Sequence, residues 1–99
     1  MKVNLNRKIP DYKGDFVKGE KGVSVIMRDV IAMALNTTGP GDTFTPEDKM
    51  MAYGISIRIM GKDEVDLSIA EMKYIQDCVG KVSAPIVIGT LTSWFDKKD

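Results

Sequence analysis

The sequence predicts an α+β domain that is mainly helical, with about four helices after a short N-terminal β-hairpin. Three observations lead to this prediction: apolar residues recur at helical spacing after residue 23, polar caps and prolines mark helix starts, and the first nine residues alternate between apolar and polar. With 99 residues, 43% hydrophobic and 28% charged, the chain has the length and composition of one globular domain over 1–99.

The hairpin is expected at the N-terminus. Its first strand covers 2–9, where apolar Val3 and Leu5 alternate with polar residues, and Pro10 ends it. A stretch rich in lysine and glycine follows and holds a second short strand over 15–18. Because an isolated two-stranded hairpin is marginal in water, we expect helices to cover one of its faces.

The first helix is expected over 24–36. Starting from Ile26, apolar residues recur at intervals of three and four, and Ser24 can act as the N-cap. The many β-branched residues leave a strand over 23–27 as the alternative. The apolar pattern is longer than an ordinary strand, which favours the helix.

The second helix, over 46–60, has a strong start signal, with Thr45 as N-cap and Pro46 at the first helical position, and Gly61 can end it. Gly54 within this helix costs about 1 kcal/mol relative to alanine and would let a neighbour approach closely. Its apolar residues form an arc broad enough for a central helix. They are Met50, Met51, Tyr53, Ile55, Ile57, Ile59 and Met60.

The third helix, over 69–79, begins with a capping box. Ser68 and Glu71 are three residues apart, so each side chain can bind the other's backbone N–H, and Gly80 is expected to end the helix. The preceding residues, 62–67, are read as a polar connection.

The fourth helix is expected over 85–95, with Pro85 at its first position and apolar residues at helical spacing up to Phe95. The same residues, "IVIGTLTSWF", have high β propensity. A C-terminal strand over 86–95 therefore remains the alternative.

Several functions are disfavoured by composition. One cysteine and no histidine exclude an internal disulfide, make a zinc site improbable and remove the commonest general base. We expect Cys78 to be a buried structural thiol and residues 39–43 to form a turn, since the phosphate-loop ending is missing. The acids at 63, 64 and 66 lack the calcium-loop pattern and are read as solvated. The expectation is a protein that is not an enzyme and uses no cofactor.

Two surfaces are candidates for binding. Met50 and Met51 are adjacent and point in different directions, so one could contact a partner. The other surface is the N-terminal hairpin, since residues 1–28 carry seven basic and three acidic residues. Its candidate nucleic-acid contacts, which combine charge with stacking rings, are Lys8, Tyr12, Lys13, Phe16, Lys18 and Lys21.

The chain also resembles a known group of proteins. A "SVIMRDVIAMAL" helix, a "KMMAYGISIRI" helix and "VDLSIAEMKYIQDCVGK" leading into "APIVIGTLTSWFD" look like the layout of small proteins from tailed phages and prophages, mostly of unassigned function. The likeness covers 23–96 and rests on capping and apolar positions, so no functional residue is carried over. It implies a phage origin and partner binding rather than metabolism.

These observations favour a non-enzymatic protein-binding module that acts in phage assembly, regulation or counter-defence. Its partner would be a phage or host protein, or a second copy in a homo-oligomer. A nucleic-acid-binding regulator that uses the basic hairpin is the alternative. No apolar run approaches the roughly 18 residues that span a bilayer. No signal peptide is visible either, so we expect no membrane contact and a location in the cytoplasm, that of the host cell if a phage encodes the protein.

Overall fold

A computed structural model describes residues 1–37 and 45–96. It confirms the mainly helical α+β class, with four α-helices and a two-stranded antiparallel sheet in the described residues. The elements in chain order are β1 (Lys2–Asn4), the short 3-10 helix η1 (Glu20–Gly22), α1 (Met27–Leu35), α2 (Pro46–Gly61), β2 (Glu64–Asp66), α3 (Ile69–Val82) and α4 (Pro85–Asp96). The turn predicted over 39–43 lies outside the described residues.

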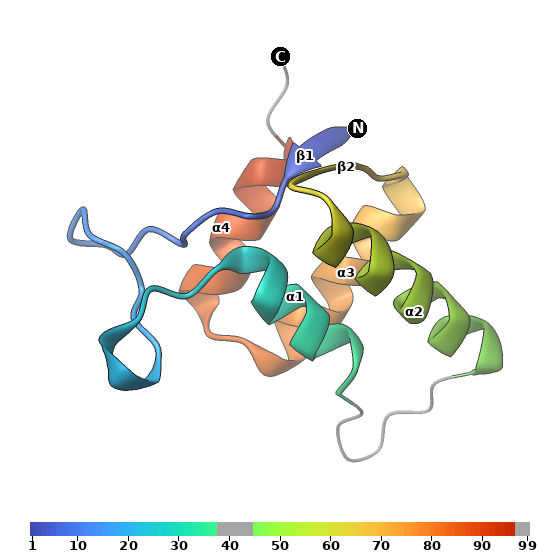
Figure 1. Cartoon of the computed structure of the whole chain (residues 1–99), viewed down its shortest axis with the longest axis horizontal. Coiled ribbons are helices and arrows are strands. Elements are labelled where there is room, and N and C mark those ends of the chain that lie inside the picture. The colour runs from blue at the N-terminus through green and yellow to red at the C-terminus, as the bar shows by residue number, and fades with distance from the viewer. Residues whose placement is uncertain (38–44, 97–99) are drawn as a thin grey trace.

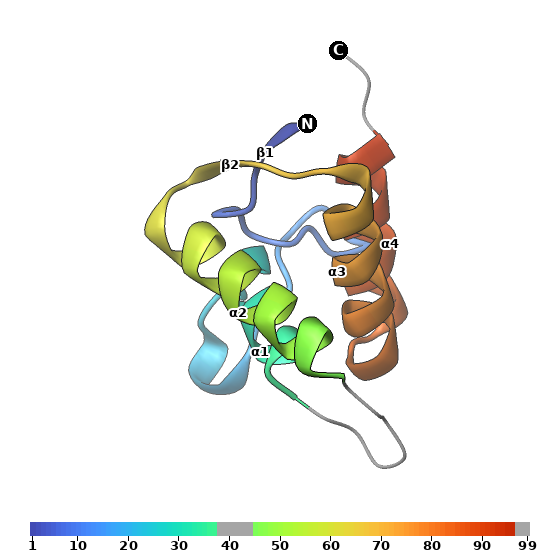
Figure 2. The ribbon, with the colours of Figure 1, turned by 90° about the vertical axis from the view of Figure 1, so that its right-hand side faces the viewer.

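Helix α1 is central to the packing. It contacts both α2 and α3, and α4 packs on α3, so that α2 lies on one side of the molecule and the α3–α4 pair on the other (Figure 2). The core takes side chains from every helix and from the N-terminal segment, and Ile9, Ile31, Ile55, Ile75 and Leu91 are all fully buried. Because α1 covers α2 from one side, only that side of α2 is buried.

The predicted helix starts at 46 and 69 are confirmed by their caps. Ahead of α2, the Asp48 N–H donates to Thr45 Oγ1 at 3.1 Å and the Thr45 N–H donates to the Asp48 carboxylate at 3.2 Å. Ahead of α3, the Glu71 N–H donates to Ser68 Oγ at 3.1 Å and the Ser68 N–H donates to Glu71 at 2.9 Å. These bonds satisfy backbone donors that have no partner inside the helix.

The C-terminal segment is helical, so the strand alternative over 86–95 is wrong. Helix α4 begins at Pro85, and Val87, Leu91 and Phe95 are buried. These three residues are spaced four apart and therefore lie on one side of a helix. Burial of a helical face outweighs the β propensity of the individual residues.

The predicted hairpin has the wrong partner strand. β1 pairs with β2, with Val3 opposite Val65, and residues 15–18 form no strand. The chain does reverse between Pro10 and Phe16, but the pairing there is a single isolated bridge. The segment 62–67, expected as a polar connection, supplies β2 because Val65 points into the core while its neighbours are exposed.

Two helix boundaries also differ from the prediction. Helix α1 starts at Met27 rather than after Ser24, because residues up to Ile26 are extended and Ile26 is bridged to Lys8. Helix α3 continues past Gly80 to Val82. Gly80 does not take the positive φ that a glycine uses to end a helix, so it is an interior residue here.

Candidate functional site

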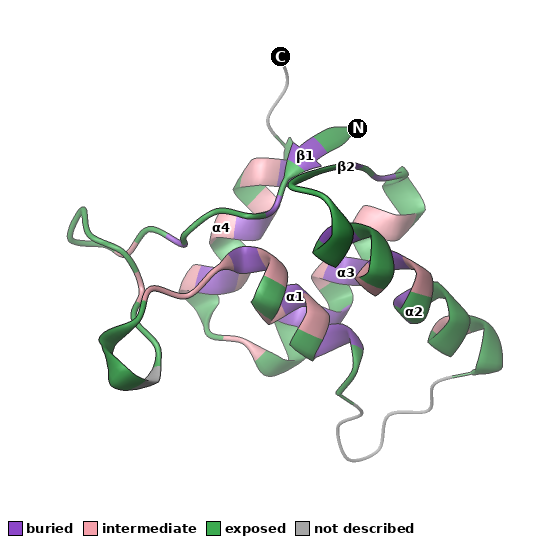
Figure 3. Cartoon of the chain, viewed as in Figure 1, coloured by how far each residue is buried: buried purple, intermediate pink, exposed green. Residues whose placement is uncertain are grey.

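Helix α2 carries two apolar faces. Ala52, Ile55 and Ile59 are buried in the core. Figure 3 shows that α2 carries both buried and exposed positions along its length. Besides Met51, four further large apolar side chains are exposed on the same helix. They are Met50 at 68%, Tyr53 at 61%, Ile57 at 54% and Met60 at 48% of full exposure.

The four exposed side chains follow one line along the helix. Their successive spacings are three, four and three residues, which keeps them on one side of an α-helix, opposite the buried side. We call this line the outer face of α2. The expectation of a central helix is therefore wrong: the apolar arc splits into a buried face and an exposed one.

The candidate contacts Met50 and Met51 are both exposed, and Met51, at 39%, lies beside the outer face. Among the six methionines after Met1, Met27 is buried and Met72 packs against the core. The other four methionines, Met33, Met50, Met51 and Met60, are exposed.

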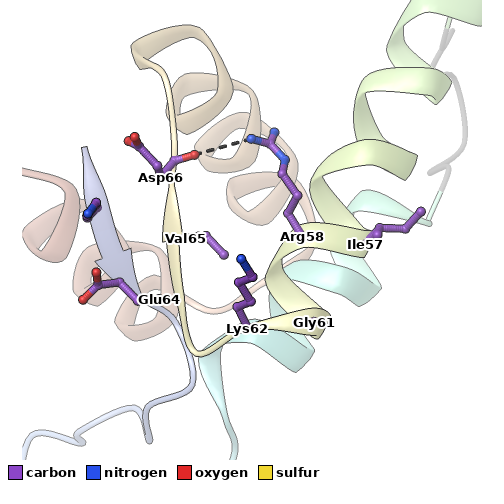
Figure 4. Close-up of a pocket in the computed structure, with 8 residues that line it drawn as sticks. Ile57, Arg58, Gly61, Lys62, Glu64, Val65 and Asp66 are labelled. Atoms are coloured by element: carbon purple, nitrogen blue, oxygen red, sulfur yellow. Dashed lines mark hydrogen bonds between the residues drawn. The ribbon is translucent and has the colours of Figure 1, made fainter.

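A groove lies next to the outer face, between α2 and β2 (Figure 4). Ile57 and Gly61 line it from α2, and Val65 lines it from the strand. The Arg58 side chain crosses the groove, where its Nη1 donates to the Asp66 carbonyl at 3.4 Å and its Nη2 pairs with the Glu71 carboxylate. The groove is therefore closed on one side by a salt-bridged arginine.

Two of the three acids after α2, Asp63 and Asp66, are engaged in bonds of the fold. The amino group of Met1 donates to the Asp66 carboxylate at 2.9 Å, and this hydrogen bond lowers the pKa of Asp66 below its usual 3.8. Asp63 accepts from Asn6 at 2.9 Å and from Arg28 at 3.4 Å. Among residues 1–37 and 45–96, no group of three or more His, Cys, Asp or Glu could hold a metal ion.

The basic N-terminal candidates form two loops on the far side of the molecule from α2 (Figure 1). Tyr12, at 85% exposure, is next to the exposed Lys13. The Lys8 ammonium lies 5.3 Å from the centre of the Phe16 ring, and Lys18 is 3.9 Å from the Asp15 carboxylate. Lys21 is exposed as well. The structure thus brings Lys8 and Phe16 together and leaves Tyr12 facing solvent.

Sequence reasoning missed a contact between this segment and α4. The Arg7 guanidinium lies 4.2 Å from the centre of the Trp94 ring on α4. No local pattern predicts the pair, since its members are far apart in the chain. The outer face, in contrast, is visible in the sequence as two apolar series on one helix. One series is Ala52, Ile55 and Ile59, and the other is Met50, Tyr53, Ile57 and Met60.

Cys78 is buried, as expected for a structural thiol, and lies on the core side of α3. In the part of the chain that the structure describes, no helix is long and apolar enough to cross a membrane. Comparison with protein-family models, curated proteins and solved structures finds no match.

Proposed function

We propose that this protein is a non-enzymatic protein-binding module whose docking surface is the outer face of α2. The single observation that carries the proposal is the line of exposed apolar side chains, Met50, Tyr53, Ile57 and Met60, opposite the buried face of the same helix. A helix that only covers a core needs one apolar face and gains solubility from a polar second face. The second apolar face has no such structural cause.

The kind of side chain supports protein binding as well. Contiguous exposed apolar patches mark sites of interaction, and tyrosine and methionine are enriched in protein interfaces. Methionine also adapts its shape to different partners. The resemblance to small tailed-phage proteins supports a role in assembly, regulation or counter-defence, in the cytoplasm of the host cell.

The proposal is tested by capture in the native host with three tagged forms of the chain. The first is the natural chain, the second carries Ile57→Lys in the outer face, and the third carries Ile69→Lys. Ile69 is a matched control because it is 82% exposed but lies on α3. A protein that the first and third forms capture, and that Ile57→Lys does not, is then purified. Its affinity for each of the three forms is measured by titration. We expect Ile57→Lys to weaken its binding at least about tenfold, as for a central interface residue.

If the tagged forms capture the host's own untagged copy of this chain, that copy is counted among the captured proteins. If the three forms captured the same proteins in the same amounts, the outer face would not be the docking surface. Thermal unfolding of each form is the control for the fold, and we expect unchanged melting temperatures because both substitutions lie on exposed positions.

A nucleic-acid role is the second candidate, and the exposure of Tyr12 next to Lys13 favours it. An exposed aromatic ring beside a lysine can stack on a base while the ammonium group contacts a phosphate. We expect single-stranded DNA to bind best at about 50 mM salt and Tyr12→Ala to weaken that binding. Absence of binding at this salt concentration would eliminate the candidate.

A further inference from the structure

We infer that a groove between the N-terminal segment and α4 binds a proline-rich peptide in the polyproline II conformation, with an acidic residue next to its prolines. The groove shares no residue with the outer face of α2, so the inference goes beyond the proposed function and does not depend on it. Three features carry it: an aromatic and apolar lining, hydrogen-bond donors without a partner in the fold, and uncompensated positive charge at the rim.

The groove follows the length of α4, beside the N-terminal segment (Figure 1). It consists of two adjoining hollows that both include Ser93 and Trp94. Arg7 lines the hollow at the end of α4, and Tyr12 lines the one at its start. Helix α4 has 12 residues and extends about 18 Å, whereas a polyproline II peptide rises about 3.1 Å per residue. The groove therefore accommodates about six residues of such a peptide.

The lining of the groove is aromatic and apolar. Tyr12, at 85% exposure, and the partly buried Trp94 contribute two aromatic rings, and Pro10 and Pro85 add apolar rings. Gly89 lines the groove from the middle of α4, where an added Cβ would meet nothing within 4 Å, so no side chain occupies this part of the groove. Aromatic-lined grooves bind proline-rich peptides, because the polyproline II helix is already formed before binding and loses little conformational entropy.

The groove also offers hydrogen-bond donors. Tyr12, Thr90 and Ser93 have hydroxyl groups, and Trp94 has an indole N–H. None of these side chains makes a hydrogen bond to another residue in the part of the chain that the structure describes. A polyproline II peptide has no internal hydrogen bonds and its prolines have no N–H, so its carbonyl groups accept bonds from outside. The four donors match this need.

Charges at the rim favour an acidic residue in the peptide. Residues 7–18 have four basic and two acidic side chains. Both acids, Asp11 and Asp15, accept backbone N–H groups of their own loop. Lys13, next to Tyr12, is exposed and makes no ion pair within 1–37 and 45–96. An acidic residue beside the prolines can therefore pair with Lys13, and it belongs at this end because Asp96 lines the other end.

The charges of α4 favour a peptide over a single-stranded nucleic acid in this groove. The helix contains no lysine or arginine, and its last residue, Asp96, is acidic. A nucleic acid that followed α4 would place a phosphate for every nucleotide along a wall without a cation. The backbone of a peptide carries no charge and meets no such penalty.

The inference is tested by fluorescence, because Trp94 is the only tryptophan of the chain and lies in the groove. The probe is a blocked peptide of about six prolines preceded by a pair of aspartates, titrated up to about 1 mM so that weak binding is detected. We expect a saturable change in Trp94 emission. Tyr12→Ala should weaken binding at least about fivefold. Tyr53→Ala is the matched control, since it removes an exposed ring from the outer face of α2, and it should leave binding unchanged.

Two further variants separate the parts of the site. Gly89→Leu places a side chain in the groove and should abolish binding. Its melting temperature should not fall, because leucine favours helix over glycine and a Cβ at this position meets nothing within 4 Å. Lys13→Gln should weaken binding of the aspartate-bearing peptide but not that of a peptide of prolines alone.

Three results would overturn the inference. The first is constant Trp94 emission up to about 1 mM peptide. The second is equal binding of a glycine–serine peptide with the same aspartates, or binding that Gly89→Leu leaves unchanged. The third is tighter binding of an oligothymidylate than of the peptide at the same salt concentration, which would assign the groove to the nucleic-acid candidate instead.

Discussion

Tyr74 shows how one residue joins elements that are distant in the chain. It extends from α3, and its hydroxyl donates to the backbone carbonyl of Asp48 in the first turn of α2 at 3.2 Å. Burial of the ring, with a smaller contribution from neighbouring Cys78 and Asp48, raises the pKa of Tyr74 to about 12. The residue thus helps to fix α2 on the core while the outer face stays exposed.

This shift predicts how stability depends on pH. Between the ordinary tyrosine pKa of 10.0 and about 12, the folded chain keeps the Tyr74 proton while the unfolded chain loses it. The contribution of Tyr74 is therefore complete below pH 10 and decreases as the pH rises toward 12. Urea unfolding of the natural chain and Tyr74→Phe should differ by about 1 kcal/mol at pH 8, and the difference should shrink above pH 10. A difference that stays constant up to pH 12 would contradict this assignment.

At the scale of elements, the caps explain why most helices could be predicted. Thr45 and Ser68 each start a helix with a local hydrogen-bond pattern that three or four residues specify completely. The start of α1 could not be read in this way, since its N-cap position, Ile26, makes no side-chain capping bond and is set by pairing with Lys8. Local signals fail where a distant segment determines the backbone.

The two faces of α2 lead to a direct comparison. Ile55 is fully buried and Ile57, two residues later, is more than half exposed. We expect Ile55→Ala to lower the free energy of unfolding by about 2–5 kcal/mol because it leaves a cavity in the core. Ile57→Ala should change it by less than about 0.5 kcal/mol, because its side chain is exposed. Equal losses for the two variants in urea unfolding would show that the outer face is part of the core.

At the scale of the whole molecule, the sheet could not be predicted because its strands are distant in sequence. β2 is only three residues long and has one buried side chain, Val65, so its sequence looks like a polar connection. It becomes a strand because α2 and α3 bring it beside β1. The candidate site was predicted in part: Met50 and Met51 were identified, but their exposure depends on which side of α2 the other helices cover.

The whole arrangement also separates the two candidate surfaces. The outer face of α2 and the basic N-terminal loops lie on opposite sides of the molecule (Figure 1). Variants in one surface can therefore be made without touching the other. Tyr12→Ala should leave capture through the outer face unchanged, and the same capture experiment checks this; loss of the captured protein would show that the loops contribute to the docking surface.

The most direct test of the account is photo-cross-linking from the outer face of α2 in the native host. One form of the chain carries a photo-reactive residue in place of Ile57, and the control carries it in place of Ile69, which is exposed on α3. We expect irradiation to attach a protein to the first form and not to the second, because a docked partner covers the outer face. No cross-linked product from position 57, or the same product from both positions, would contradict docking through this face.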